Sequence, residues 1–298
     1  MGDHQEDQLE YLQILLKRER ESTFRISLFL GFTQPELTIE DRLDQIRFIK
    51  QCGNSLKCST ETIQSAIHNL DRYMSQLKFH SDNRQYRFCA ITSLYIQSKI
   101  SEADCPITDS ILGLKLFIEE EELKEQTRHY ETDITVDHIK LVEPHMLKLL
   151  EFRLHCVTPW SILYNLLTCY PPPIEIQSLL NCDLMKMCET VINVMHTDYS
   201  CIDSLPSTLV VSTIWAVLDY YSFRNNNTQL SVISIIQNYI NSWKRLFLCD
   251  NDDINMMRTR IMNMIETQVK LQDATQIIKT ISPQKPSLLH TLPIAVGA

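Results

Sequence analysis

Apolar residues recur at helical spacing along almost the whole of this 298-residue chain. Within residues 60–77 they stand at positions i, i+3, i+4 and i+7, which places them on one face of a helix. Residues 86–100 and 208–221 are apolar on nearly every side, which is typical of helices at the centre of a bundle. Only 5 residues are glycine, which argues against a turn-rich β fold and against a glycine-rich phosphate-binding loop. The sequence therefore predicts an all-α fold.

Prolines divide this helical pattern into parts. Thr158-Pro159 and the three prolines at 171–173 interrupt it, because a residue before proline is pushed out of the helical region. Each half holds about five helices, with the most apolar one in the middle. The predicted parts are an N-terminal helix and lead-in over 1–37, a first bundle over 38–157, a second bundle over 158–270 and a flexible tail over 271–298.

The charge of the chain limits its partners. It has 28 basic and 37 acidic residues, a net charge of −9, which disfavours direct binding of nucleic acid. Residues 100–140 hold 11 acids and 4 bases, or −7, so the remainder is nearly neutral. No apolar run is long enough to span a membrane, and residues 1–8 lack the apolar core of a signal peptide. The ten cysteines, none in C-x-x-C spacing, are expected to be reduced core thiols, with no metal and no cofactor.

Polar motifs in a fixed order resemble the cyclin box. They are LDRYMS at 70–75, QSKISE at 97–102 and VEPHMLKLLEFRL at 142–154. Counting back from Asp71 places Arg42 at the arginine of the first helix of the box. The likeness runs from about residue 38 to residue 159, and 158–270 looks like the second, degenerate cyclin fold. The resemblance implies two tandem five-helix bundles preceded by a short N-terminal helix.

The resemblance also implies a function. A cyclin is a non-catalytic regulatory subunit that binds and activates a cyclin-dependent kinase, here expected as a heterodimer in cell-cycle progression, in nucleus and cytoplasm. In the family, the residues matching Lys99 and Glu143 bond to kinase backbone groups beside the αC helix and activation segment. From spacing alone both would be interpreted as solvated helix charges. The apolar residues expected near the same edge of the bundle are Ile100, Leu147, Phe152 and Leu154.

Two further features concern the first bundle. Arg42 and Asp71 match a pair on facing helices, and a buried pair of this kind fixes helix register while adding little net stability. Pro144 directly follows Glu143, and an interior proline removes a backbone hydrogen bond and costs about 3 kcal/mol. A kink or restart of the helix there is expected to leave Glu143 less securely placed than Lys99.

Other segments depart from the family or extend it. Asp41, Gln45 and Phe48 stand where a cyclin normally has the methionine, leucine and tryptophan of its substrate-docking patch. With two of three apolar anchors lost, docking of arginine-x-leucine motifs in substrate proteins is expected to be weak. Residues 114–130 lengthen the connection between Lys99 and Glu143. A solvated acidic loop or short helix is favoured there over a contact for a basic partner.

The tail and the N-terminus bear on regulation and subfamily. Ser282-Pro283-Gln284-Lys285 has the form that cyclin-dependent kinases phosphorylate, and the added charge would create a recognition point for a ubiquitin ligase. The N-terminal helix looks somewhat like that of D-type cyclins, although the retinoblastoma-docking L-x-C-x-E motif is absent. The alternatives are a transcription-type cyclin, a cyclin-fold scaffold, or a general transcription factor of the IIB type. A IIB-type factor would bring a zinc ribbon and a basic surface.

Overall fold

The described part of the chain is built from helices. The computed structural model describes residues 3–21, 30, 33–77, 82–101, 136–180, 183–224, 230–247 and 249–281. Every regular element in these ranges is a helix, apart from one isolated bridge between Leu30 and Gln34. This confirms the all-α prediction. In the same ranges, no helix combines the length and the apolar character needed to cross a membrane.

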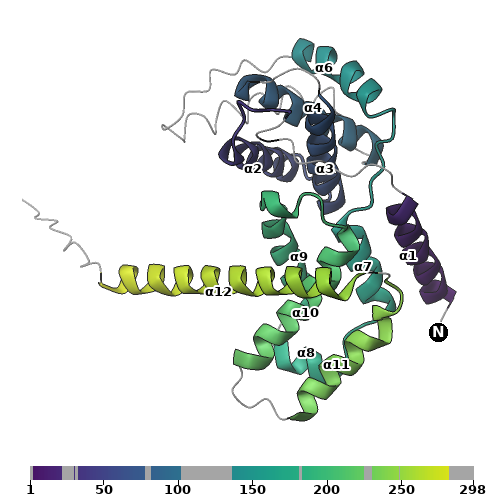
Figure 1. Ribbon diagram of the computed structural model, residues 1–298, viewed down its shortest axis with the longest axis vertical. Helices are drawn as coiled ribbons and strands as arrows, with labels where there is room; N and C mark the ends of the chain where they lie inside the picture. The colour runs from purple at the N-terminus through teal and green to yellow at the C-terminus, as the bar shows by residue number, and fades with distance from the viewer. Residues whose placement is uncertain are drawn as a thin grey trace, which may run out of the picture.

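The first bundle lies at the top of Figure 1 and surrounds α4. Its described helices are α2 (Ile39–Ser55), α3 (Thr60–Gln76), α4 (Asn83–Ser101) and α6 (Val136–Leu149). Helix α4 packs against the other three, as expected for a segment that is apolar on nearly every side. Thr38 forms a capping box with Asp41 at the start of α2, and Ser59 caps α3. Each cap satisfies backbone amides that have no partner within the helix.

The second bundle surrounds α10 (Pro206–Arg224). Thr158 caps the first helix of this bundle in a capping box with Ser161, and Pro159 occupies the first turn, where a missing amide hydrogen costs nothing. Helix α10 contacts the five α-helices around it, again as its apolar sequence predicts. They are α7 (Pro159–Cys169), α8 (Ile174–Leu180), α9 (Leu184–Met195), α11 (Leu230–Lys244) and α12 (Asn251–Ile281), and the short 3-10 helix η1 (Tyr199–Cys201) follows α9.

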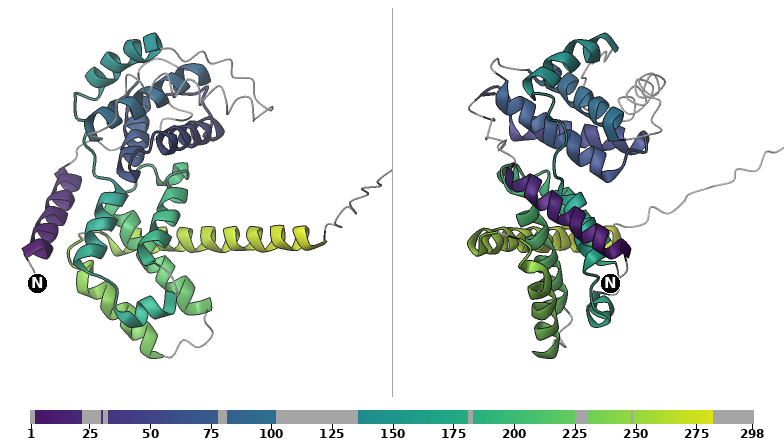
Figure 2. Two further views of the ribbon diagram at one scale, coloured as in Figure 1. Left: turned by 180° about the vertical axis from the view of Figure 1, so that it is seen from behind. Right: turned by 90° about the vertical axis from the view of Figure 1, so that its right-hand side faces the viewer.

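The N-terminal helix α1 (Asp3–Glu21) packs on the second bundle, against α7. It is 19 residues long, longer than the short helix expected, and it runs alongside α7 (Figure 2). Leu12 and Leu16 are buried in the core of the second bundle. The Glu19 carboxylate accepts a hydrogen bond of 2.7 Å from the amide of Ser207 at the start of α10. The chain therefore begins on the second bundle and forms the first bundle afterwards.

Helix α12 corrects the expected start of the tail. It continues to Ile281, whereas a flexible tail was predicted from residue 271. In Figure 1 its C-terminal part projects away from the bundle. An apolar stripe is required only where a helix packs on a neighbour, so a sequence without one does not by itself mark the end of a helix. The first proline that would stop it is Pro283.

Candidate functional site

The C-terminal end of α4 and the middle of α6 bring Lys99 and Glu143 together. Nζ of Lys99 donates to Oε1 of Glu143 at 2.7 Å and lies 4.6 Å from the centre of the Tyr95 ring. The hydrogen bond to Glu143 raises the pKa of Lys99, so the ammonium group is charged at neutral pH. The side chains remain 44% and 20% exposed. An exposed pair of this kind contributes about 0–1 kcal/mol to stability, which leaves both groups accessible to a partner at little cost to the fold.

Pro144 does not interrupt α6. The helix runs from Val136 to Leu149 with Pro144 inside it, and Glu143 still reaches Lys99. The helix therefore does not restart at Pro144, and Glu143 keeps its place beside Lys99. Proline removes the hydrogen bond to the carbonyl four residues earlier, that of Lys140. Lys140 and Pro144 are both exposed, so water on that side of the helix can satisfy the carbonyl.

The four apolar residues expected at this edge have different environments. Ile100 is 39% exposed and Phe152 is 71% exposed, while Leu147 packs partly against the core of the first bundle. Leu154 is only 8% exposed and belongs to that core. The chain turns back into the bundle after Phe152, so Leu154 offers little surface in the free chain, and its contact with a partner stays a prediction.

One exposed apolar residue on α6 was missed by sequence reasoning. Leu141 is 74% exposed and lies two residues before Glu143. Its sequence signal was its failure to fit the spacing of the core residues Ile139, Val142 and Met146. Leu141 inside α6 and Phe152 beyond its C-terminal end both add exposed apolar surface to this region. We call Lys99, Ile100, Glu143, Leu147 and Phe152 the α4–α6 edge.

Arg42 and Asp71 form a buried bidentate ion pair between α2 and α3. Nε and Nη2 of Arg42 donate to Oδ1 and Oδ2 of Asp71 at 3.0 and 2.8 Å, and the side chains are only 3% and 4% exposed. Burial acts to lower the pKa of Arg42, but the Asp71 carboxylate outweighs it and the pKa is raised. The Arg42 guanidinium is therefore charged at neutral pH.

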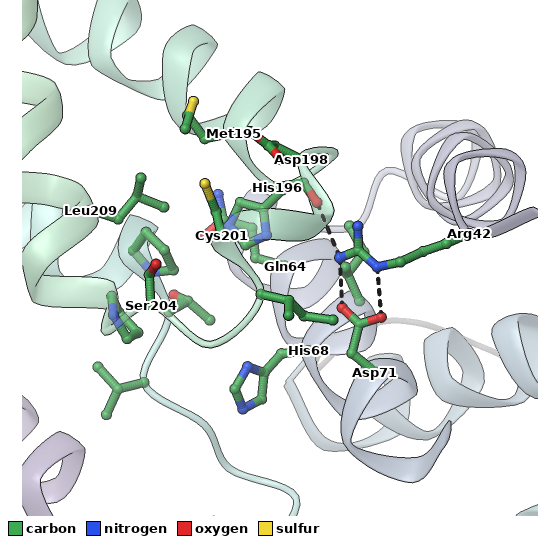
Figure 3. Close-up of a pocket in the computed structure, with 16 residues that line it drawn as sticks. Arg42, Gln64, His68, Asp71, Met195, His196, Asp198, Cys201, Ser204 and Leu209 are labelled. Atoms are coloured by element: carbon green, nitrogen blue, oxygen red, sulfur yellow. Dashed lines mark hydrogen bonds and ion pairs between the residues drawn. The ribbon is translucent and has the colours of Figure 1, made fainter. Parts of the chain in front are cut away.

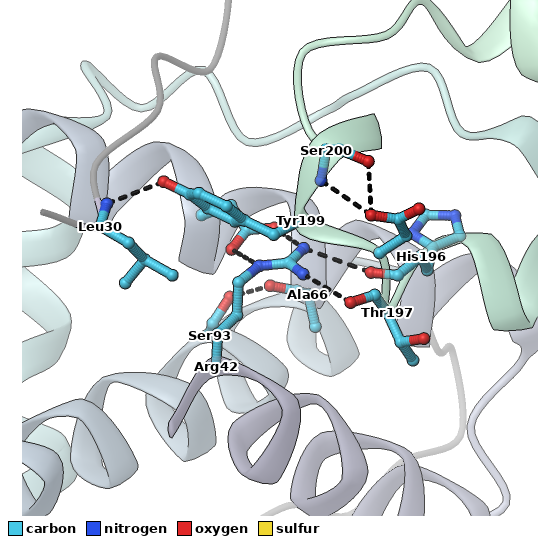
Figure 4. A network of polar contacts seen from close by, with 10 residues as sticks. Leu30, Arg42, Ala66, Ser93, His196, Thr197, Tyr199 and Ser200 are labelled. Atoms are coloured by element: carbon cyan, nitrogen blue, oxygen red, sulfur yellow. Dashed lines mark hydrogen bonds and ion pairs between the residues drawn. The ribbon is translucent and has the colours of Figure 1, made fainter. Parts of the chain in front are cut away.

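Arg42 also reaches the second bundle, a role that the sequence did not show. Its guanidinium donates to the carbonyl oxygens of His196 and Thr197 at 3.2 and 3.4 Å (Figure 4). Lys50, also on α2, donates to the carbonyl oxygen of Asn193 at 2.7 Å. These carbonyls lie at the C-terminal end of α9, where helical carbonyls lack partners and favour a cation. Two cations of α2 thus cap a helix of the other bundle.

A small cavity lies beside this junction (Figure 3). Its volume is about 70 Å³, and it is lined from both bundles, by Arg42, His68 and Asp71 on one side and by His196 on the other. Burial lowers the pKa of both histidines to about 3, and the cations Arg42 and Lys50 act on His196 in the same direction. Nε2 of His196 is buried without a hydrogen-bond partner among the described residues. The space suits water molecules and not an organic cofactor.

The positions of the degenerate docking patch are covered by α4. Gln45 and Phe48 are 2% and 6% exposed. Asn83 bridges the patch, since it accepts from Gln45 at 2.8 Å and donates to Asp41 at 2.7 Å. The guanidinium of Arg87 lies 4.0 Å from the centre of the Phe48 ring. This part of the surface therefore presents polar groups of α4 where a docking peptide would need an open apolar groove.

Two predicted features and the question of a metal site remain. Ser282 and the acidic segment 114–130 are not within the described ranges. Among the residues that are described, no group of three or more His, Cys, Asp or Glu side chains has an arrangement that could hold a metal ion.

Comparison with known proteins identifies the family. Residues 10–155 match the family model of the cyclin N-terminal domain. The structure is similar to that of a viral cyclin from herpesvirus saimiri, with a TM-score of 0.60 and 14% sequence identity over 86% of this chain and 96% of that one. No curated protein sequence is significantly similar to this chain. The chain belongs to the cyclin family, and the all-helical, two-bundle architecture is that of a cyclin.

Proposed function

We propose that this cyclin binds and activates a cyclin-dependent protein kinase through the α4–α6 edge. The supporting observation is the accessible Lys99–Glu143 ion pair with exposed apolar side chains at Ile100 and Phe152. Interfaces typically combine an apolar centre, which supplies affinity, with charges that set orientation. A kinase surface with backbone carbonyls and amides beside an apolar helix face would match both parts.

The internal ion pair does not have to break when a kinase binds. The Lys99 ammonium has three donor hydrogens and uses one on Glu143. Glu143 accepts through Oε1, so its other oxygen can accept from a kinase amide. Each side chain therefore orients the other toward the partner.

Activation would be conformational and not chemical. A kinase becomes active when its αC glutamate pairs with the β3 lysine and its activation loop is ordered. A rigid partner that binds only this arrangement shifts the kinase population toward it. The α4–α6 edge suits that task because α4 is held by three neighbouring helices of the first bundle.

A charge reversal separates kinase binding from a purely structural role. Lys99→Glu is expected to lower affinity for a panel of purified cyclin-dependent kinases by at least tenfold and to abolish the activation of phosphorylation. The double variant Lys99→Glu/Glu143→Lys restores an internal pair with reversed polarity, so it is expected to fold normally and still not bind. The matched control is the reversal of Asp44 and Arg47, an exposed pair on α2 with side chains 21% and 66% exposed. Kinase binding by the double variant would refute the proposal.

The same proposal includes a cell-cycle role in nucleus and cytoplasm. Identification of the co-purifying kinase by mass spectrometry, together with cell fractionation, tests both points. A complex that phosphorylates the polymerase tail would instead identify a transcription-type cyclin. A chain that binds no kinase of the panel would be a cyclin-fold scaffold.

A further inference from the structure

The turn after α6 holds Phe152 in an unfavourable backbone conformation. Glu151 and Phe152 have φ of 53° and 56°, in the left-handed region, which costs a residue with a β-carbon about 1–2 kcal/mol. The amides of Phe152 and Arg153 donate to the carbonyl oxygens of Leu147 and Leu150, each at 2.9 Å. Consecutive residues stay in this region only where the surroundings over-determine it.

Three buried side chains of α3 and α4 supply that constraint. Nδ2 of Asn69 and Nε2 of Gln97 both donate to the carbonyl oxygen of Leu154, at 2.8 and 3.1 Å. Nη1 of Arg72 donates to the carbonyl oxygen of Arg153 at 2.7 Å and to Oδ1 of Asn69 at 2.9 Å. All three are 1–3% exposed. We call Asn69, Arg72 and Gln97 the turn anchor.

The turn anchor fixes the two peptide carbonyls that follow Phe152. Burying three polar side chains is costly unless each is hydrogen-bonded, and here much of their bonding is directed at this one turn. The result is a Phe152 side chain left 71% exposed while Leu154, two residues later, is buried in the core. An aromatic ring exposed to this extent gains little for folding, so the burial of Leu154, and not Phe152 itself, offsets the strain of the turn in the free chain.

We propose that Asn69, Arg72 and Gln97 are positioning residues that hold Phe152 ready for contact with the kinase. This inference rests on the proposed function, because it requires Phe152 to touch the partner. A ring already held in its binding position loses less conformational freedom on association, which increases affinity without a new contact. The turn anchor does not itself touch the kinase, since it is buried inside the first bundle.

Two conservative variants test the turn anchor. Gln97→Met keeps the length of the side chain and removes the donor, and Asn69→Asp keeps the acceptor for Arg72 while removing the donor to Leu154. Each is expected to weaken binding of the full-length chain to the tightest-binding kinase of the panel by about threefold to tenfold. The control is Ser93→Ala, which removes a buried 2.7 Å bond from α4 to the Ala66 carbonyl of α3 (Figure 4). The control is expected to leave kinase affinity unchanged.

A double-mutant comparison separates positioning from general destabilisation. In the Phe152→Ala background the Gln97→Met and Asn69→Asp substitutions are expected to have no further effect on affinity. An equal loss in both backgrounds, or a loss no larger than that of Ser93→Ala, overturns the turn-anchor inference and leaves the proposed function intact. Unchanged affinity of Phe152→Ala itself means instead that the proposed kinase contact at Phe152 is wrong.

Hydrogen exchange gives a second readout that needs no kinase. In Gln97→Met the amides of Phe152 and Arg153 are expected to exchange at least tenfold faster, while the amides of α3 keep their native rates. Native exchange rates at both turn amides would overturn the inference even if binding changed.

Discussion

Arg42 of the first bundle donates to the carbonyl oxygen of His196 in the second bundle at 3.2 Å. The same guanidinium holds Asp71 in a bidentate pair. One side chain therefore joins α2 to α3 within the first bundle and to the end of α9 across the junction. The relative placement of the two bundles depends on the same charge that sets helix register within the first.

Loss of Arg42 is expected to be strongly destabilising. Arg42→Ala leaves the Asp71 carboxylate buried without its partner and uncaps α9, which should lower the free energy of unfolding by about 3–5 kcal/mol. Urea denaturation followed by circular dichroism measures this loss. Asp71→Asn, which keeps a polar group of the same size, is the matched comparison and should cost less. A loss below 1 kcal/mol for Arg42→Ala would contradict the role assigned to the pair.

Acid is expected to destabilise the junction through its histidines. The pKa values of His68 and His196 are about 3 in the folded chain, below their ordinary value of about 6.5. Between those values the unfolded chain binds protons that the folded chain does not, so stability falls as the pH falls, by up to about 1.4 kcal/mol per pH unit for each histidine. Urea unfolding at pH 7 and pH 5 should show a smaller loss for His196→Asn than for the native chain. Equal losses would show that His196 is not held neutral.

The covered docking patch predicts weak recruitment of arginine-x-leucine peptides. The native chain should show no saturable binding by fluorescence anisotropy at micromolar concentration, because Gln45 and Phe48 are buried beneath Asn83 and Arg87. Phe48→Ala should reduce stability by about 3–5 kcal/mol. It should leave peptide binding as weak as before. Tight binding that disappears in Phe48→Ala would contradict this prediction.

Ser282 remains a predicted phosphorylation site of the active complex. Incubation of the purified complex with ATP should give phosphate on Ser282, detected by mass spectrometry, because the proline and the lysine three residues later match the kinase preference. In cells, Ser282→Ala should then slow turnover of the chain, measured after protein synthesis is blocked. An unmodified Ser282 in a complex that phosphorylates other substrates would exclude the site.

The candidate site was only partly predictable from the sequence. Lys99 and Glu143 could be placed at one edge, since the motifs assign them to helices that neighbour each other in a cyclin. The burial of Leu154 could not be predicted, because it depends on the left-handed turn at Glu151 and Phe152. No glycine marks that turn, and the anchor residues that hold it lie on α3 and α4.

The all-α class, the two apolar central helices and the polar motifs could be predicted from the sequence, since all of them depend on local spacing. The donors that bind the backbone carbonyls become known only from the folded chain. The carbonyls of His196 and Leu154 accept bonds from Arg42 and Asn69, yet a carbonyl is the same in every residue and leaves no trace in the sequence. The continuation of α6 through Pro144 was equally hard to predict. It depends on whether solvent reaches the carbonyl that the proline leaves without a donor, and that is decided by the packing around the helix.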